Sequence, residues 1–285
     1  MNSLSKKLLL GTVGLVIAAG TVVAGENLVK NGGAEDAATV KKWHKALSQN
    51  TEDKLSGEAS FHGKTKNIWS YSPGHIEIDP SKAYKLSASI KTAGTDKSTC
   101  YIGLVSYDAK KRTIQRPNIT IIKGSFTTLV ADAKAGAKVL QVKDCSKWNK
   151  KLIKRIKIAL NAKKDYSDLP NFNLTNKIVK FEKKGDIYEV TLTSPLKANL
   201  KAGTKVRAHL NYGGYQYCVA SAKPAPAKWT KYSAVIKGMA KFGAPNKQFW
   251  PGTKYVKVVV IINYQAKKDS DTQALFDEVT FSQVD

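Results

Sequence analysis

The alternation of apolar and polar residues over 84–91 constrains the fold more than any other feature of this sequence. Tyr84, Leu86, Ala88 and Ile90 alternate with two lysines and two serines, so the segment has one apolar and one polar face. Because successive side chains of a strand point to opposite faces, this pattern predicts a half-buried β-strand. Short apolar segments recur along the chain between turn residues, and we therefore expect an all-β fold.

The segment 255–264 predicts a second strand with two unlike faces. One face is uniformly apolar and is assigned to the core; it consists of Val256, Val258, Val260 and Ile262. The opposite face is mixed and suits the wall of a binding groove; it consists of Tyr255, Lys257, Val259, Ile261 and Asn263. Among the tryptophans, Trp43 and Trp229 are assigned to the core.

Both ends of the predicted domain carry a carboxylate in a setting that suits a cation. Glu35 follows the turn 31–33, beside backbone carbonyls that the turn leaves unpaired. Asp277 alternates with the apolar residues of 275–281, and a carboxylate on an apolar face needs a partner. Because Ca²⁺ takes carboxylate and carbonyl oxygens, we expect a structural Ca²⁺ held by Glu35 and Asp277. The alternative is that Glu35 bonds the opening turn and Asp277 pairs with a lysine.

Five motifs resemble those of carbohydrate-binding modules of families 4, 9 and 22, which have galactose-binding-like jelly-roll folds. They are NLVKNGGAE at 27–35, YKLSASIK at 84–91, YIGLVSYD at 101–108, WTKYSAVI at 229–236 and ALFDEVTF at 274–281. Ala34 stands where those families usually have an aromatic residue. The resemblance implies a jelly-roll β-sandwich that binds carbohydrate without catalysis, and a calcium ion shared by Glu35 and Asp277.

The middle of the chain departs from these motifs. The resemblance covers about 26–124 and resumes near residue 211, so the jelly roll comprises 26–124 and 211–285. Between them, turn residues separate five strand candidates at 139–142, 155–160, 177–181, 187–192 and 204–209. Short, regularly spaced strands are typical of a compact barrel. We therefore predict a small inserted β-barrel-like subdomain over 125–210.

The first 24 residues have the pattern of a secretory signal peptide. Two lysines precede an apolar run over 8–19, and small residues lead to Ala24. The run is too short to span a membrane comfortably, so we expect a secreted, periplasmic or cell-surface protein without a transmembrane segment after cleavage. Of the three cysteines, Cys100 and Cys218 lie in predicted strands of one domain and could pair, although their spacing does not show it.

The charge of the chain points to an anionic partner. Lys and Arg number 47 against 22 Asp and Glu; without the first 24 residues 45 remain against 22, a net charge of +23. Such a charge favours acidic or sulfated polysaccharide, or an anionic envelope, although a lysine-rich surface can also serve solubility alone. Lysine predominates and no nucleic-acid motif is present, so we expect no nucleic-acid partner.

Aromatic side chains are the candidate ligand-binding residues, because sugar rings stack on aromatic faces while amides reach the hydroxyl groups. The candidates are Trp69, Tyr71, Tyr107, Tyr215, Gln216, Tyr217, Trp250 and Asn263. The group 215–217 follows two glycines, which favour close approach of a ligand. Taken singly, each aromatic residue is more often a core residue.

A catalytic role is not predicted. A glycosidase needs two opposed carboxylates in a cleft, whereas each acidic residue here has a turn or structural interpretation. The four histidines are scattered. The sequence therefore predicts a secreted, non-catalytic carbohydrate-binding protein that prefers acidic or sulfated polysaccharide. The alternatives are a structural or adhesive envelope protein held by electrostatics, and an accessory module acting with a glycoside hydrolase.

Overall fold

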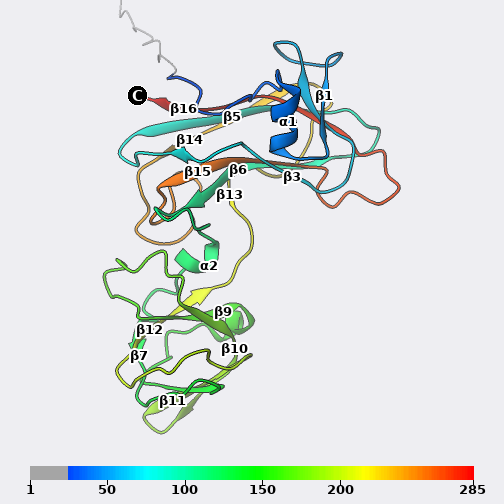
Figure 1. Ribbon diagram of the computed structural model, residues 1–285. Helices are drawn as coiled ribbons and strands as arrows, with labels where there is room; N and C mark the ends of the chain where they lie inside the picture. Colours follow the sequence, from blue (N-terminus) through cyan, green and yellow to red (C-terminus); the bar gives the residue numbers. More distant parts are fainter. Residues whose placement is uncertain (1–24) are drawn as a thin grey trace, which may run out of the picture.

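The computed structural model describes residues 25–285, so the predicted signal peptide at 1–24 lies outside the described residues. Figure 1 shows a β-sandwich joined through the short helix α2 (Arg116–Ile119) to a smaller β-domain below it. The predicted all-β jelly-roll sandwich with an inserted barrel-like subdomain is confirmed. No helix of the described part of the chain is long and apolar enough to cross a membrane.

Two antiparallel sheets form the sandwich. The first has the order β1-β2-β16-β5-β14. Its strands are β1 (Leu47–Asn50), β2 (Ser60–Gly63), β16 (Ala274–Val284), β5 (Ala83–Thr92) and β14 (Thr230–Lys237). The second has the order β13-β6-β15-β3, with β4 also paired to β15. Its strands are β13 (Gln216–Pro224), β6 (Thr99–Tyr107), β15 (Tyr255–Ile262), β3 (Ile68–Tyr71) and β4 (Ile76–Glu77).

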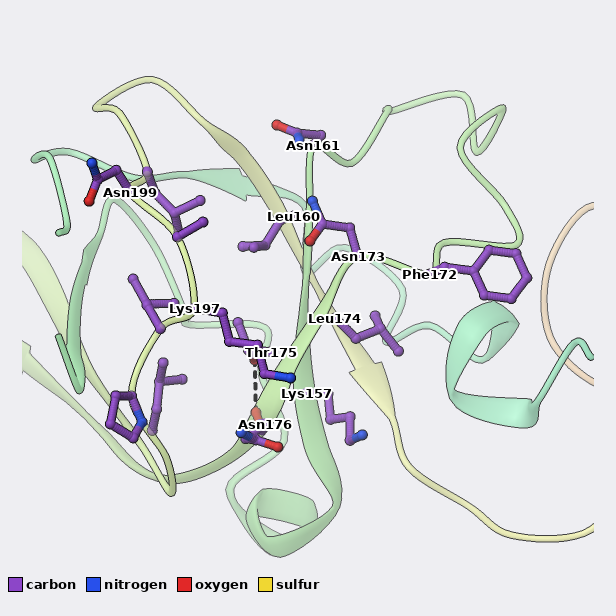
Figure 2. Close-up of a pocket in the computed structure, with 15 residues that line it drawn as sticks. Lys157, Leu160, Asn161, Phe172, Asn173, Leu174, Thr175, Asn176, Lys197 and Asn199 are labelled. Atoms are coloured by element: carbon purple, nitrogen blue, oxygen red, sulfur yellow. Dashed lines mark hydrogen bonds between the residues drawn. The ribbon is translucent and has the colours of Figure 1, made fainter. Parts of the chain in front are cut away.

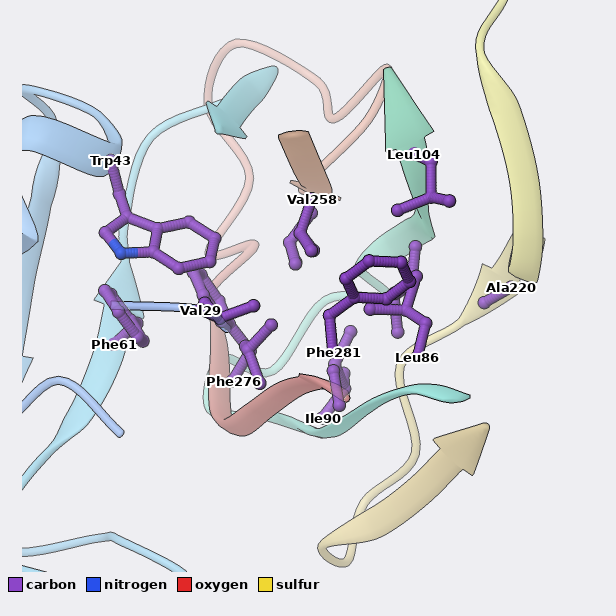
Figure 3. Packing of buried hydrophobic residues seen from close by; sticks show 14 of the residues in the cluster. Val29, Trp43, Phe61, Leu86, Ile90, Leu104, Ala220, Val258, Phe276 and Phe281 are labelled. Carbon is purple, nitrogen blue, oxygen red and sulfur yellow. The ribbon is translucent and has the colours of Figure 1, made fainter. Parts of the chain in front are cut away.

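The sandwich core lies between the facing sides of these sheets (Figure 3). Phe61 and Phe276 stack with ring centroids 4.4 Å apart, and Trp43 packs against both. Trp43 lies on helix α1 (Ala37–Trp43), which Asp36 caps by accepting a bond from the Ala38 backbone N–H. The assignment of Trp43 to the core is confirmed.

Trp229 is not part of that core, contrary to the prediction. It stands just before β14, is partly exposed and donates its indole N–H to Asp53 Oδ1 at 3.0 Å. Asp53 also pairs with Lys91 on β5 and thus ties the loop 51–58 to the first sheet. The indole needs this polar partner, which lies in the loop and not in the interior.

A β-bulge changes the expected faces of β16. The register with β5 shifts between Asp277 and Thr280, and Glu278 has a positive φ of 48°. Phe276 precedes the bulge, whereas Val279 and Phe281 follow it, and all three side chains therefore point into the core. The predicted common face of 275, 277, 279 and 281 is wrong, because the extra residue reverses the alternation at Asp277.

The inserted segment forms a sheet with the order β7-β12-β9-β10-β11-β8. Its strands are β7 (Thr127–Thr128), β8 (Val139–Val142), β9 (Ile156–Leu160), β10 (Leu174–Lys184), β11 (Ile187–Leu192) and β12 (Lys205–Leu210), with the 3₁₀ helix η1 (Lys150–Arg155) before β9. Leu129 bridges Val142, so the two ends of this sheet meet and close a barrel. Its interior is a second core of mainly aliphatic residues, with Trp148 buried at its side.

A packed junction joins the barrel to the sandwich. Asn118 on α2 and Asn171 in the barrel exchange two hydrogen bonds: the backbone N–H of Asn171 donates to Asn118 O at 2.9 Å, and the Asn118 amide donates to Asn171 O at 3.1 Å. Trp250 packs there with Ile114 and Ile119. The barrel is therefore held by side-chain packing as well as by its two connecting segments.

Among the described residues the three cysteines are free thiols. Cys100 and Cys218 both adjoin the sandwich core, and the possible disulfide between them is not formed. Burial raises the pKa of Cys100 to about 11 and that of Cys218 to about 12, so both are protonated and unreactive at neutral pH.

Candidate functional site

Seven aromatic side chains gather on the outer side of the second sheet, and we call this set the aromatic face. It consists of Trp69 and Tyr71 on β3, Tyr101 and Tyr107 on β6, Tyr215 and Tyr217 at the start of β13, and Tyr264 after β15. Alternate residues of the same strands, such as Ile68, Leu104 and Val258, point into the sandwich core. The period of two therefore supplies the core and the aromatic face from one set of strands.

The rings of the aromatic face support one another edge to face. Tyr215 lies between Trp69 and Tyr71, with ring centroids 6.2 and 6.1 Å away and interplanar angles of 79° and 81°. The hydroxyl groups of Tyr71 and Tyr215 are 3.4 Å apart. The ring centroids of Tyr101 and Tyr217 are 4.7 Å apart. All seven rings remain partly exposed, so they form a fixed surface that water and a ligand can reach.

Close approach of two strands brings the β13 tyrosines to this face. A Cβ atom on Gly103 of β6 would lie 2.0 Å from the carbonyl oxygen of Gln216 on β13. Only glycine fits there, and its lack of a side chain also leaves the middle of the face flat. Of the two glycines before Tyr215, Gly214 has a φ of 92°, a backbone conformation that glycine adopts without steric cost.

Five of the eight predicted sugar-binding residues lie together on the aromatic face: Trp69, Tyr71, Tyr107, Tyr215 and Tyr217. The other three are buried and cannot contact a ligand. Gln216 points to the opposite side of β13, where its amide donates to three backbone carbonyls of 245–248. Asn263 donates to the carbonyls of Gly63 and Thr65. Trp250 is 1% exposed within the junction core.

These corrections share one physical reason. A buried amide or indole N–H group needs an acceptor inside the protein, and the segments packed against Gln216, Asn263 and Trp250 supply carbonyl oxygens. Two further residues of the face, Tyr101 and Tyr264, were missed by the sequence analysis. Tyr101 shares the alternation of Tyr107 along β6, so the period of two was sufficient to find it. Tyr264 follows the end of β15 and gave no such signal.

A groove of about 490 Å³ adjoins the aromatic face at Tyr71, Tyr107 and Tyr215. The turn 72–74 forms one wall, and Lys42 of α1 and Lys257 of β15 line it as well. Among the described residues no Asp or Glu lines this groove. Partial burial lowers the pKa of His75, and the positive charges of Lys257 and Lys111 lower it further, so His75 is neutral at pH 7 beside a cationic groove.

Tyr71, Tyr107 and Tyr217 of the aromatic face are neutral at physiological pH. Burial raises the pKa of Tyr71, and its hydrogen bond with Tyr215 raises it further. Burial likewise raises the pKa of Tyr107 and Tyr217. The hydroxyl groups therefore act as hydrogen-bond donors and acceptors, which suits sugar hydroxyl groups.

The predicted calcium ligands lie together at the bulge of β16. A Cβ atom on Gly33 would be 3.0 Å from Glu35 Oε1 and 3.7 Å from Asp277 Oδ1, so both carboxylates border the opening turn. Asp277 has no exposed surface. Its Oδ2 accepts the backbone N–H groups of Leu55 at 3.0 Å and Ser56 at 3.2 Å.

The alternative partners expected for these acids are not the observed ones. Asp277 accepts backbone N–H groups and forms no ion pair with a lysine in the described part of the chain. Glu35 Oε2 accepts the N–H of Glu58 at 2.7 Å, outside the opening turn. Two adjacent carboxylates, one of them buried, fit a hard cation, but among residues 25–285 no third His, Cys, Asp or Glu joins them. Backbone carbonyls or water must therefore complete any calcium shell.

The barrel carries a separate cavity of about 530 Å³, shown in Figure 2. Leucines form much of its wall, and the amides of Asn161, Asn173, Asn176 and Asn199 line it. Phe172 is the one aromatic residue among the lining residues described, and it packs under the Arg112 guanidinium, whose Cζ is 4.0 Å from the ring centroid. This cavity therefore lacks an available ring for stacking a sugar.

No family model matches the sequence, and no curated protein matches it either. Three solved structures are similar in fold. One is the CBM22-1 xylan-binding domain of Paenibacillus barcinonensis Xyn10C, at 9% identity and a TM-score of 0.36, covering 92% of this chain and 96% of that domain. Another is a family 16 carbohydrate-binding module, at 14% identity and a TM-score of 0.32, covering 90% and 99%.

The third structure holds the CBM22-1 and GH10 modules of Clostridium thermocellum xylanase 10B in complex with xylohexaose. It is 11% identical with a TM-score of 0.32, and the match covers 83% of this chain but 24% of that one. All three contain carbohydrate-binding modules, the class of protein that the motif resemblance names. All three TM-scores are below 0.5. The description of the site above therefore rests only on the residues of this chain.

Proposed function

We propose that this chain is a non-catalytic carbohydrate-binding protein whose aromatic face contacts a polysaccharide. The observation that carries the proposal is the aromatic face itself, where seven partly exposed rings share one side of one sheet beside a groove. The C–H surfaces of sugar rings pack on such side chains, and the tyrosine hydroxyl groups reach the sugar hydroxyl groups. Because the rings already brace one another, little side-chain entropy is lost on binding.

We further propose a preference for acidic or sulfated polysaccharide. Lys42 and Lys257 line the groove, and the chain without its first 24 residues carries a net charge of +23. This charge attracts a polyanion from a distance, and the two lysines then lie beside the bound chain. In this proposal the protein is secreted, periplasmic or on the cell surface, and it can serve as an accessory module that holds a glycoside hydrolase on its substrate.

Affinity electrophoresis in gels containing neutral xylan, polygalacturonate or a sulfated polysaccharide tests the proposal. The double variant Tyr71→Ala/Tyr215→Ala should weaken retardation about tenfold or more, since it removes two adjacent rings. Tyr188→Ala, which removes a half-buried tyrosine of the barrel, is the matched control and should bind as the parent does. Failure of the parent to be retarded by any of these glycans at low salt would rule the proposal out.

A second candidate is electrostatic attachment to an anionic envelope without a sugar pocket, and the net charge favours it. The dependence of binding on salt concentration distinguishes electrostatic attachment from stacking on the aromatic face. Purely electrostatic binding should disappear at high ionic strength and survive the Tyr71→Ala/Tyr215→Ala change. Stacking on the aromatic face should survive salt and be lost in that variant. Lys42→Gln/Lys257→Gln should weaken binding to polygalacturonate while sparing neutral xylan.

We also propose a structural calcium ion beside the bulge of β16. Glu35 and Asp277 would hold it, with backbone carbonyls completing the shell, and the ion would tie the opening turn to the last strand. An ion that binds only the folded state raises the melting temperature as its concentration rises. The parent should melt higher in excess Ca²⁺ than in chelator, and Asp277→Asn should not respond. Identical melting curves of the parent in both conditions would refute the site.

A further inference from the structure

A second cavity, the junction pocket, lies where the sandwich meets the barrel. It measures about 350 Å³ and is lined by Ile121, Ile122, Gly124, Phe126, Lys164, Tyr166 and Arg207. Its walls come from the segment that leads into the barrel, from the loop between β9 and β10, and from strand β12. A volume near the lower end of the range for small-molecule sites suits one sugar residue. The pocket shares no residue with the aromatic face.

Tyr166 provides an aromatic wall that is held in a strained conformation. Its φ is 70°, a region that bulky residues rarely adopt and that costs on the order of 1 kcal/mol or more. Two bonds fix this loop: Asp168 Oδ1 accepts the backbone N–H of Lys163 at 3.0 Å, and Arg207 donates to Lys163 O at 3.0 Å. The ring contacts Phe242 of the sandwich, with centroids 5.1 Å apart. Strain that places one ring at a cavity is typical of a functional site.

Positive charges surround this ring pair. The Nζ atom of Lys241 lies 5.5 Å from the centroid of the Tyr166 ring, and Nζ of Lys123 lies 5.2 Å from that of Phe242. Lys164 lines the cavity directly. All three lysines are exposed, and no ion pair of theirs is found in the described part of the chain. One of these three uncompensated ammonium groups therefore lines the cavity, and the other two lie over the ring pair beside it.

The nearby carboxylates of the loop are already engaged. Asp168 Oδ2 pairs with Arg207 at 2.7 Å, which also neutralises the guanidinium. Asp165 accepts bonds from the backbone N–H and hydroxyl group of Ser167. The lysines, and not Arg207, thus supply the net charge that a ligand meets, while Arg207 positions Tyr166.

We propose that the junction pocket binds a single sugar residue that carries a carboxylate or a sulfate. The Arg207 guanidinium lies over the Tyr166 ring, with Cζ 5.3 Å from the ring centroid. The sugar ring packs against the part of Tyr166 that Arg207 leaves uncovered, and its anionic group lies toward Lys164 and Lys241. An anion desolvated beside an aromatic wall interacts more strongly with ammonium groups than it does at an open surface. This inference extends the proposed function to a second contact with the same acidic glycan, but the pocket would bind such a unit even without the aromatic face.

NMR spectroscopy of the ¹⁵N-labelled protein tests the pocket, because backbone signals of 121–126, 163–168 and 241–243 report on it separately from those of β3, β6 and β13. The probes are trigalacturonate, its carboxyl-reduced neutral form, and a sulfated galactose oligosaccharide without carboxylates. We expect saturable shifts at the pocket with trigalacturonate or the sulfated probe and none with the neutral form. The two anionic probes distinguish a carboxylate from a sulfate ligand.

Variants locate the interaction. Lys164→Gln/Lys241→Gln should weaken trigalacturonate binding at the pocket about tenfold, as should Tyr166→Leu. Lys138→Gln/Lys184→Gln removes the same charge from exposed lysines that line none of the cavities described, and it should leave pocket affinity within about twofold.

The outcomes separate this inference from the proposed function. Shifts confined to the aromatic face, or equal shifts with the neutral form, would overturn the pocket while leaving the proposed function intact. Shifts confined to the pocket would support the pocket and contradict the proposed role of the aromatic face. Equal weakening by both lysine pairs would also overturn the pocket, because it would indicate general charge attraction.

Discussion

The sandwich and the inserted barrel are built from similar short strands but use the second side of those strands differently. In the sandwich, the sheet that contains β3, β6, β13 and β15 has a core side and an aromatic face. The barrel closes on itself, so one side of its sheet fills the interior and the other meets water. On β10 that outer side carries Lys177, Val179, Lys180 and Lys183.

This difference shows how one alternation produces two surfaces. An open sandwich presents a broad, flat side on which rings can gather, whereas a narrow barrel presents a curved, polar outside. The barrel instead contributes a loop, 161–173, that reaches back to the sandwich and closes the junction pocket. The two proposed recognition surfaces therefore differ in character: the aromatic face is open, whereas the junction pocket is small and cationic.

The largest expected effect on stability comes from the buried ion pair at the junction between the barrel and the sandwich. Arg207 is 1% exposed, pairs with Asp168 and also bonds His209. Arg207→Met should lower the free energy of unfolding by about 3–5 kcal/mol, because it leaves a nearly buried carboxylate unpaired. Arg207→Met/Asp168→Asn should recover part of the loss. Urea denaturation monitored by circular dichroism measures both, and a loss below about 1 kcal/mol would mean that the junction is not stabilised by this pair.

A smaller effect should appear with pH at the same junction. Burial lowers the pKa of His209 to about 4, below its ordinary value of 6.5, and its ring bonds Pro117 O and Arg207. The unfolded chain therefore binds the proton first, so this contribution to stability is present above pH 6.5 and is lost as the pH falls toward 4. Between pH 7 and 5 the loss should be about 2 kcal/mol.

Variants identify that titration. His209→Gln should flatten the dependence of the unfolding free energy on pH between 7 and 5, whereas His75→Gln, which changes an exposed histidine beside the aromatic face, should leave most of the slope. An unchanged slope in His209→Gln would contradict the assignment.

A still smaller change asks whether sandwich and barrel unfold together. Phe276→Leu in the sandwich core and Ile158→Val in the barrel core should each cost about 1 kcal/mol. If the packed junction couples the two regions, each change shifts one common transition in calorimetry. Two transitions, each moved by only one of the variants, would show that the regions unfold separately.

The smallest effect concerns the aromatic face alone. Tyr71→Phe removes the hydroxyl contact with Tyr215 but keeps the ring, so stability should change by less than about 0.5 kcal/mol. Glycan retardation should fall far less than in Tyr71→Ala, since the stacking surface remains. Equal loss in Tyr71→Phe and Tyr71→Ala would show that the hydroxyl group, and not the ring face, contacts the sugar.

Much of the fold was readable from local patterns. The alternation over 84–91 and 255–262 correctly placed Leu86, Ile90 and Val258 in the core. The five strands predicted for the barrel correspond to β8, β9, β10, β11 and β12, and only the short strand β7 was not predicted. Five of the eight sugar-binding residues predicted were found on one face for the same reason. Side-chain alternation is a property of the strand itself, so it needs no knowledge of the rest of the molecule.

What packs against each face was decided only in three dimensions. Gln216 lies between two tyrosines of the aromatic face in the sequence, yet it is buried and donates to the carbonyl of Gln248 in a distant loop. Trp250 is buried in the junction core and donates to the carbonyl of Pro245. The bulge at Asp277 reverses an alternation that the sequence shows as regular. The junction pocket joins residues near 122, 166, 207 and 242, which no local pattern connects. Burial depends on contacts between distant segments, whereas the sequence by itself determined which side of a strand a residue occupies wherever no bulge interrupts the alternation.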